Sequence, residues 1–282
     1  MTGRVVRLPA AGRLLVAADL HGNHEDYAAL RALFLQWLEQ DPDSHWLLLG
    51  DAVHGPDAAT AARDPALYGY ADRSFDIVAD LARLRRSHPN RIHYLLGNHD
   101  HAHLGGRATG RFHPDEAAAL EDRLTPAQRA ALRTFFDEAQ LAAVAPCGLL
   151  FSHASPGAAL QRLSDLDRLA LDPRRNDDAG NRLLHAMLWP YSQSDAATRR
   201  LLRKVSADGI EVRLLIHGHD RDEEGWFIDG RHALCPVLFG APPGEKRYLD
   251  VDLAARYDDP LDLREHREIR RLHPAAATRF FG

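Results

Sequence analysis

Short apolar runs recur along the chain, and most are followed by a stretch that carries apolar residues at helical spacing. A run of about five apolar residues is typical of a strand buried on both faces of a sheet. The predicted strands are 13–18, 45–49, 92–96, 148–151 and 212–216. Alternation of such strands with amphipathic helices predicts an α/β fold built in layers.

The segments between the strands predict helices at 25–40, 74–88, 125–141, 196–207 and 261–272. Thr125 followed by Pro126 is typical of an N-cap residue and the first helical position. After residue 230 the pattern changes, and 233–239 and 246–253 are predicted to pair as antiparallel strands across a proline-rich turn. Segments 56–71 and 172–180 are predicted to be irregular.

Composition narrows the class of protein. The 282 residues suffice for one large or two smaller domains with a sizeable core. A net charge of −5 argues against a nucleic-acid binder that depends on bulk charge. Neither an apolar run of membrane-spanning length nor a signal peptide is evident. Two cysteines cannot build a disulfide framework, so we expect a reducing, cytoplasmic environment.

Histidine is unusually frequent, at 17 residues, which is about three times average usage. Several histidines follow predicted strands directly, together with Asp and Asn. These segments are Asp19-Leu20-His21, Gly50-Asp51, Gly97-Asn98-His99-Asp100, Ser152-His153 and His217-Gly218-His219. Ligands bind outside the carboxyl ends of strands in open α/β sheets, so we expect these side chains to converge.

The donor types indicate a metal centre. Carboxylate, imidazole and amide oxygen without thiolate suit hard to borderline divalent ions such as Mn²⁺, Fe²⁺ or Zn²⁺. About seven donors are too many for one ion and suit a pair of ions that share a carboxylate. The donor set therefore predicts a dinuclear metal centre, in which two cations would lower the pKa of a bridging water.

The ordered set of Asp-x-His, Gly-Asp, Gly-Asn-His-Asp, a lone His and a final Gly-His resembles the signature of the calcineurin-like metallophosphoesterase superfamily. Four weaker blocks are similar to its phosphoprotein phosphatase branch. These blocks are 151–157, 187–190, 219–226 and 239–242. The resemblance implies a four-layer α/β/β/α sandwich of two mixed sheets flanked by helices. We expect a single domain over 1–282, with a helix at about 260–273 packed outside.

The resemblance also implies two ion sites that share Asp51. The first ion would take Asp19, His21 and Asp51, and the second would take Asp51, Asn98, His153 and His219. His217 stays open between two roles. It either binds the second ion while His219 binds the first, or it lies beside the site, and the spacing from His219 to Gly225 favours the second role.

His99 follows the expected ligand Asn98 and is the candidate general acid for the leaving alkoxide. Asp100 or His54 would orient its ring. The phosphatase branch usually has Gly-Asp-x-x-Asp-Arg-Gly, whereas this chain has Gly-Asp-Ala-Val-His-Gly at 50–55. The Asp that orients the catalytic His in that branch, and the Arg that binds phosphate there, are therefore absent from the corresponding positions of this chain.

The sequence leaves open which residues replace the missing Asp and Arg and bind the phosphate. Asp72 and Arg73 either fold back to supply the missing groups or form a surface pair. Arg107 and Arg111, with His101, His103 and His113, form either a positive rim for phosphate or a solvated loop. Arg73, Arg107 and Arg111 are the candidate substrate-binding residues.

Three functions are compatible with these residues. The first is a phosphatase for phosphomonoesters, including phosphoserine and phosphothreonine in proteins, with two divalent ions, Mn²⁺ first among them. The second is a phosphodiesterase or dinucleoside polyphosphate hydrolase. The third is a metal-binding scaffold without catalysis, which the intact set of ligands and His99 disfavours.

Overall fold

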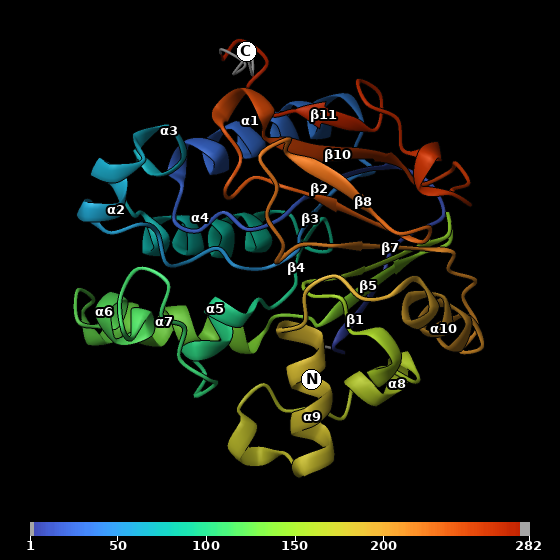
Figure 1. Ribbon diagram of the computed structural model, residues 1–282, viewed down its shortest axis with the longest axis horizontal. Coiled ribbons are helices and arrows are strands. Elements are labelled where there is room, and N and C mark those ends of the chain that lie inside the picture. The colour runs from blue at the N-terminus through green and yellow to red at the C-terminus, as the bar shows by residue number, and fades with distance from the viewer. Residues whose placement is uncertain (1–2, 277–282) are drawn as a thin grey trace.

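Two mixed β-sheets form the centre of the molecule in the computed structural model, which describes residues 3–276. The five-stranded sheet has the order β11-β10-β2-β3-β4 and the six-stranded sheet the order β1-β5-β6-β7-β9-β8 (Figure 1). The first sheet comprises β2 Arg13–Ala17, β3 Ser44–Leu48, β4 Ile92–Tyr94, β10 Arg247–Asp252 and β11 Ile269–Arg271. The second comprises β1 Val5–Arg7, β5 Ala142–Ala145, β6 Leu149–Ser152, β7 Leu214–His217, β8 Trp226–Asp229 and β9 Ala233–Pro236.

Within each sheet, the strands that carry the polar segments run parallel to one another. β2 pairs in parallel with β3, and β3 with β4. In the other sheet β6 pairs in parallel with β7. Parallel strands end at the same edge of a sheet, so the segments that follow these five strands are delivered to two adjoining edges.

Alternating side chains of each strand serve two different cores. Leu47 packs between the sheets, with Phe151 and Ile216 of the opposite sheet in the same cluster. Trp46 and Leu48 point the other way and pack against the helices. All five residues of β3 are buried, because both of its faces are covered.

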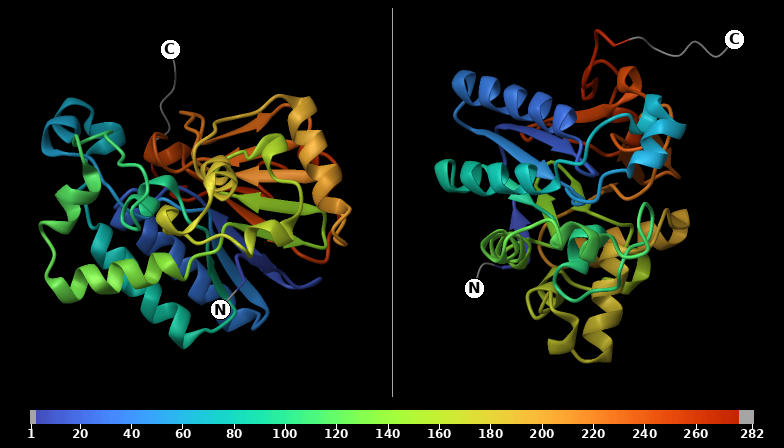
Figure 2. Two further views of the ribbon diagram at one scale, coloured as in Figure 1. Left: turned by 90° about the horizontal axis from the view of Figure 1, so that it is seen from below. Right: turned by 90° about the vertical axis from the view of Figure 1, so that its left-hand side faces the viewer.

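Helices cover both outer faces and complete four layers. α1 His24–Gln40 and α4 Ser74–Ser87 pack on the five-stranded sheet, while α8 Leu163–Leu166 and α10 Asp195–Ser206 pack on the six-stranded sheet. Figure 2 shows the blue and teal helices and the yellow and orange helices on different sides of the strands. The remaining helical elements are α2 Ala58–Arg63, α3 Pro65–Tyr68, α5 Asn98–Ala102, α6 Glu116–Glu121, α7 Pro126–Asp137, α9 Asp178–Leu188 and the 3₁₀ turns η1 Gly157–Ala159, η2 Pro173–Arg175, η3 Pro243–Glu245 and η4 Pro260–Asp262.

The predicted four-layer α/β/β/α sandwich is confirmed, as are the five predicted strands and the helices at 25–40, 74–88 and 196–207, within a few residues. The helix predicted at 125–141 is present as α7 and ends earlier, at Asp137. Thr125 caps it, since its hydroxyl accepts from the backbone N–H of Gln128 and Gln128 accepts from the backbone N–H of Thr125.

Two predictions near the C-terminus are wrong. The helix expected at 261–272, which was predicted to pack on the outside of the domain at about 260–273, is instead the turn η4 and the strand β11. β11 pairs with β10, and this pairing satisfies its backbone groups at the sheet edge. The hairpin of 233–239 with 246–253 does not form, because β9 and β10 belong to different sheets.

The two segments predicted to be irregular contain short helices. Segment 56–71 holds α2 and α3, and 172–180 holds η2 and the first turn of α9. Asp57 and Asp64 cap the two helices of the first segment, and Asp177 caps α9. Each of these carboxylates accepts a hydrogen bond from a backbone N–H of the first turn, which is the usual contribution of Asp to a helix start.

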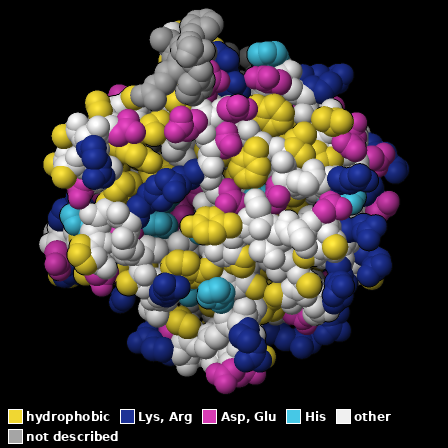
Figure 3. Space-filling view, viewed as in Figure 1, with side chains coloured by type: hydrophobic (Ala, Val, Ile, Leu, Met, Phe, Trp, Pro, Cys, Tyr) yellow, Lys and Arg dark blue, Asp and Glu magenta, His cyan; other side chains and the backbone are white. Residues whose placement is uncertain are grey.

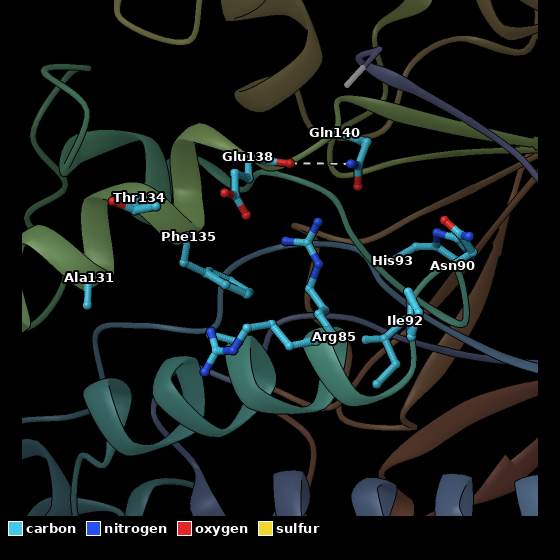
Figure 4. A pocket seen from close by; sticks show the side chains of 12 residues that line it. Arg85, Asn90, Ile92, His93, Ala131, Thr134, Phe135, Glu138 and Gln140 are labelled. Carbon is cyan, nitrogen blue, oxygen red and sulfur yellow. Dashed lines mark hydrogen bonds between the residues drawn. The ribbon is translucent and has the colours of Figure 1, made fainter. Parts of the chain in front are cut away.

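A cavity of about 520 Å³ lies between α4 and α7. Arg85 and Phe135 project into it from the two helices, and Gln140 lines the other side (Figure 4). It shares no lining residue with the pocket described below.

The surface carries both signs of charge. Basic and acidic side chains both occur in many separate places on the face drawn in Figure 3. Among residues 3–276 no helix has the length and apolar character needed to cross a membrane.

Candidate metal centre

The predicted ligands converge from both sheets. Asp19 and His21 follow β2, Asp51 follows β3, and Asn98 opens α5 just after β4. From the second sheet, His153 follows β6 and His219 follows β7. Hydrogen bonds join the loops after β2 and β3, including those from the His21 N–H to the Asp51 carbonyl and from the Asp19 N–H to the Gly50 carbonyl.

Asp51 lies between two groups of donors. Its Oδ2 is 3.7 Å from His21 Nε2 and 3.6 Å from His153 Nε2. Ligand atoms of Asp51, His153 and His219 all lie within 4.8 Å of one another, and so do those of His21, Asp51 and His99. We call the residues Asp19, His21, Asp51, Asn98, His153 and His219 the Asp51 cluster. Asp51 has the central position that a shared carboxylate requires.

One nitrogen of each histidine in the cluster faces a backbone carbonyl. His21 Nδ1 lies 3.3 Å from the His54 carbonyl and His153 Nδ1 lies 2.7 Å from that of Leu49. His219 Nε2 lies 3.1 Å from the carbonyl of Trp189. A carbonyl can only accept, so this nitrogen carries the proton and the other one keeps a lone pair. Metal-binding histidines are held in this way.

The electrostatics of the cluster fit a missing positive charge. Burial and the charge of Asp51 raise the pKa of Asp19 well above its usual value, and burial and Asp100 do the same for the pKa of Asp51. Asp19 Oδ1 is buried without a hydrogen-bond partner. Divalent cations would neutralise both carboxylates and coordinate this oxygen, so the donors fit metal ions.

The histidines of the cluster are uncharged. Burial and the neighbouring His99 lower the pKa of His21 well below its ordinary value, and burial and His219 do so for His153. Burial lowers the pKa of His219 to about 4. Neutral imidazole is the form that coordinates metal, so no proton competes at neutral pH.

The backbone is strained where it delivers these ligands. Asp19, His21, Asp51 and His219 all have φ between 43° and 69°. Non-glycine residues rarely adopt this left-handed region. The turn after β4 also needs glycine at 97, because a Cβ there would lie 2.0 Å from Asp51 Oδ1. The fold therefore accepts local strain in order to aim the ligands.

His99 lies at the edge of the cluster and lines its pocket. Its backbone N–H donates to Asp51 Oδ1 at 2.9 Å. On the far side of the ring, His99 Nδ1 is 3.0 Å from His54 Nδ1 and 3.3 Å from Glu116 Oε2. His54 and Glu116 therefore both lie beside this nitrogen of the ring.

Asp100 has different partners. Its carboxylate accepts from the backbone N–H of Asp51, Ala52 and Gly97, and from the Tyr94 hydroxyl at 2.7 Å. These bonds fasten the loop after β3 to the loop after β4. Asp100 therefore holds the ligand-bearing loops together, rather than contacting the His99 ring.

His217 lies beside the cluster and not in it. Its ring is fully buried, with Nε2 3.5 Å from Asp229 Oδ2 and Nδ1 3.6 Å from Asp220 Oδ2. Of the two roles left open for His217 and His219, the geometry favours His219 as the ligand of the Asp51 group.

Two of the three candidate phosphate-binding arginines line the pocket, and the third, Arg73, does not. Arg107 and Arg111 line the pocket, of about 240 Å³, and Arg221 lines it as well. Arg107 lies 4.9 Å from the ring centre of Trp189, and Arg111 lies 4.8 Å from that of Phe239. Such cation–π contacts hold a guanidinium in place at the mouth.

Arg73 is outside the pocket. The segment at Asp72 and Arg73 does fold back, with the Arg73 N–H bonded to the Gly22 carbonyl, but the Arg73 side chain pairs with Asp76 at the surface. His101 and His103 are buried, which removes them from the predicted rim.

Sequence reasoning missed Glu116 and Arg221. Glu116 comes from α6, far from the signature, and nothing in its local sequence separates it from a surface glutamate. Arg221 lies two residues after His219, and its proximity to the last signature block was the available signal.

The chain belongs to the calcineurin-like phosphoesterase family, whose sequence pattern matches residues 12–221. Membership supports a phosphoester hydrolase that uses divalent metal ions, and the Asp51 cluster supplies candidate ligands for them. No curated protein sequence matches the chain.

Solved structures share the fold at low sequence identity. A protein serine/threonine phosphatase from Saccharomyces cerevisiae matches with a TM-score of 0.61 and 16% identity, over 91% of this chain and 81% of that one. A cold-active protein-tyrosine phosphatase of a Shewanella species matches with a TM-score of 0.54 and 14% identity, over 90% and 78%.

Metal loading is expected to stabilise the protein, because cations relieve the repulsion of buried carboxylates. An ion at a hundred-fold excess over its Kd contributes about 2.7 kcal/mol, which corresponds to several degrees in Tm. Thermal unfolding of chelated and Mn²⁺-loaded protein measures this rise. Asp51→Asn should abolish it, and His217→Gln should retain it. If Mn²⁺ did not raise the Tm of the His217→Gln variant, His217 would be placed among the ligands.

Asp100→Ala is expected to lower the free energy of unfolding by about 3–5 kcal/mol, since it leaves three buried donors, the N–H groups of Asp51 and Gly97 and the Tyr94 hydroxyl, without an acceptor. Urea unfolding measures the loss. Asp100→Asn keeps one acceptor oxygen and should lose less. A stable Asp100→Ala protein with reduced turnover would instead mean that Asp100 acts on His99.

Proposed function

We propose that this chain is a metal-dependent phosphatase that hydrolyses phosphomonoesters, with phosphoserine and phosphothreonine of proteins as its substrates. The observation that carries the proposal is the Asp51 cluster at the base of a pocket whose mouth holds Arg107, Arg111 and Arg221. Carboxylate and imidazole ligands at the base, with guanidinium groups above them, suit a phosphate group bound to metal.

The metal centre is proposed to hold two divalent ions, with Mn²⁺ as the first candidate. Asp19, His21 and Asp51 would hold one ion, and Asn98, His153 and His219 the other, together with Asp51. Bound ions supply Lewis acidity toward the phosphate and lower the pKa of a water ligand. The carbonyl partners of the histidines keep the ligating nitrogens unprotonated and aimed inward.

His99 is proposed to donate a proton to the leaving oxygen. It lines the pocket, and its ring centre lies 4.6 Å from that of His21. His54 and Glu116 contact its Nδ1 and fix the plane of the ring, so that Nε2 stays free for the substrate. No cysteine lines the pocket, which favours direct hydrolysis over a covalent cysteinyl intermediate.

A second candidate substrate is phosphotyrosine, favoured by the aromatic mouth. Trp189, Phe239 and Tyr191 line the pocket, and Tyr191 stacks on His219 at 4.7 Å while 64% of its surface stays exposed. An exposed ring beside the metal centre fits an aromatic leaving group. The Shewanella structure of the same fold is named a protein-tyrosine phosphatase.

The activity assay compares p-nitrophenyl phosphate, its bis ester, and peptides carrying phosphoserine or phosphotyrosine, with and without Mn²⁺. We expect Mn²⁺-dependent turnover of the monoesters, and loss of about 10²-fold in kcat for His99→Ala with the phosphoserine peptide. The loss should be smaller with p-nitrophenyl phosphate, whose leaving group needs less help from an acid. After loading with two equivalents of Mn²⁺, the His99→Ala variant should contain as much Mn²⁺ as the parent protein.

Other outcomes of the same assay would redirect the proposal. Preference for the bis ester would indicate a phosphodiesterase or dinucleoside polyphosphate hydrolase. Turnover of none of the substrates by metal-loaded protein would indicate a scaffold. Loss of Mn²⁺ in His99→Ala would make His99 a ligand and not the acid.

Arg107→Gln, Arg111→Gln and Arg221→Gln are each expected to raise KM for a phosphomonoester about 10-fold, since each removes one charge-assisted hydrogen bond of about 1.4 kcal/mol. Steady-state kinetics measure the change. Arg73→Gln is the matched control, because Arg73 pairs with Asp76 outside the pocket, and its KM should equal that of the parent. A raised KM in Arg73→Gln would return it to the substrate site.

A further inference from the structure

Behind His99, three donor atoms converge outside the Asp51 cluster. His54 Nδ1 lies 3.0 Å from His99 Nδ1, and Glu116 Oε2 lies 3.3 Å from His99 Nδ1 and 3.9 Å from His54 Nδ1. All three residues are buried. Ligands bound tetrahedrally to one ion at the usual zinc distances are separated by about 3.4 Å. These spacings therefore match one coordination sphere. We call His54, His99 and Glu116 the Glu116 cluster.

Glu116 Oε2 faces this cluster with no hydrogen-bond donor of its own. The other carboxylate oxygen accepts from the Phe112 N–H at 2.9 Å. A buried anionic oxygen without a donor is costly, and a cation between the three residues would satisfy it.

The outer nitrogen of His54 is supported in the manner of a metal ligand. His54 Nε2 lies 3.0 Å from His103 Nε2, and His103 Nδ1 lies 2.9 Å from Glu121 Oε1. Glu121 can accept from His103, and His103 can then accept from His54. This order places the His54 proton on Nε2 and leaves a lone pair on Nδ1, which faces the cluster and also lies 3.3 Å from the Thr109 hydroxyl oxygen.

The cluster has its own access from solvent. A cavity of about 250 Å³ is lined by His54 and Glu116, and also by Asp57, Asp72 and His113. This cavity shares no lining residue with the pocket of the Asp51 cluster. The cavity therefore brings solvent close to His54 and Glu116 from a side other than the substrate pocket, and Arg123, which pairs with Asp72, lines it as well.

We propose that His54, His99 and Glu116 form a further cation site, separate from the Asp51 cluster, for a borderline divalent ion such as Zn²⁺. Two imidazoles and one carboxylate are a donor set that Zn²⁺ takes readily. His99 also lines the substrate pocket, so an ion on its Nδ1 fixes the ring that faces the substrate. The site goes beyond the proposed phosphatase and does not depend on it.

The test counts bound ions in the full-length chain. Metal-free protein is dialysed against Zn²⁺, and bound zinc is measured by elemental analysis. The expected result is three tightly bound ions per chain for the parent, and two for Glu116→Gln and for His54→Gln. His113→Gln and Asp57→Asn are matched controls that line the same cavity without joining the cluster, and they should keep three ions.

Two further arms separate the outcomes. Asp19→Asn weakens the Asp51 cluster only, so the ion that depends on Glu116 should persist in this background. Circular dichroism verifies that each variant is folded. If His54→Gln does not fold, the zinc count of the isosteric Glu116→Gln variant alone tests the site. An unchanged zinc count in folded Glu116→Gln overturns the site, and the three residues would then only hydrogen-bond to one another around the His99 ring. Because no arm measures turnover, an inactive enzyme would not affect the result.

Discussion

The burial of Asp19 and Asp51 at the ends of two adjacent strands is the constraint on which the rest of the site depends. Two carboxylates that approach one another away from water repel, and their pKa values rise as a result. The fold nevertheless brings them together by holding both residues at positive φ. Such an arrangement is stable when the negative charge is balanced, and the neutral imidazoles and the Asn98 oxygen around them complete a donor set for cations.

Much of this site could be predicted because its chemistry is local to strand ends. A polar residue directly after a buried parallel strand lies at the carboxyl edge of the sheet. The sequence order therefore suffices to place five of the residues together, namely Asp19, Asp51, Asn98, His153 and His219. His217 is less certain from the sequence, because two histidines separated by one residue follow the same strand, and only the spacing from His219 to Gly225 favours His219 as the one that faces the cluster. In the structure His217 faces Asp220 and Asp229 instead.

The parts that failed are those decided by contacts between distant segments. The apolar spacing of 261–272 resembles a helix, yet pairing of β11 with β10 determines its conformation. β9 and β10 both look like strands, but the choice of sheet depends on neighbours that the local pattern does not encode. Glu116 is a similar case. Its role beside His99 exists because α6 packs against α5, and the residue type alone carries no such information.

The candidate ligands are divided between the sheets, with Asp19, His21, Asp51 and Asn98 after strands of the five-stranded sheet and His153 and His219 after strands of the six-stranded one. Any sliding of one sheet over the other would therefore change the separation of the two halves of the metal centre. The interdigitated leucines and Phe151 between the sheets resist such shear. Core packing thus has a mechanical part in the chemistry: a cavity in the inter-sheet layer would loosen the metal centre without touching any ligand.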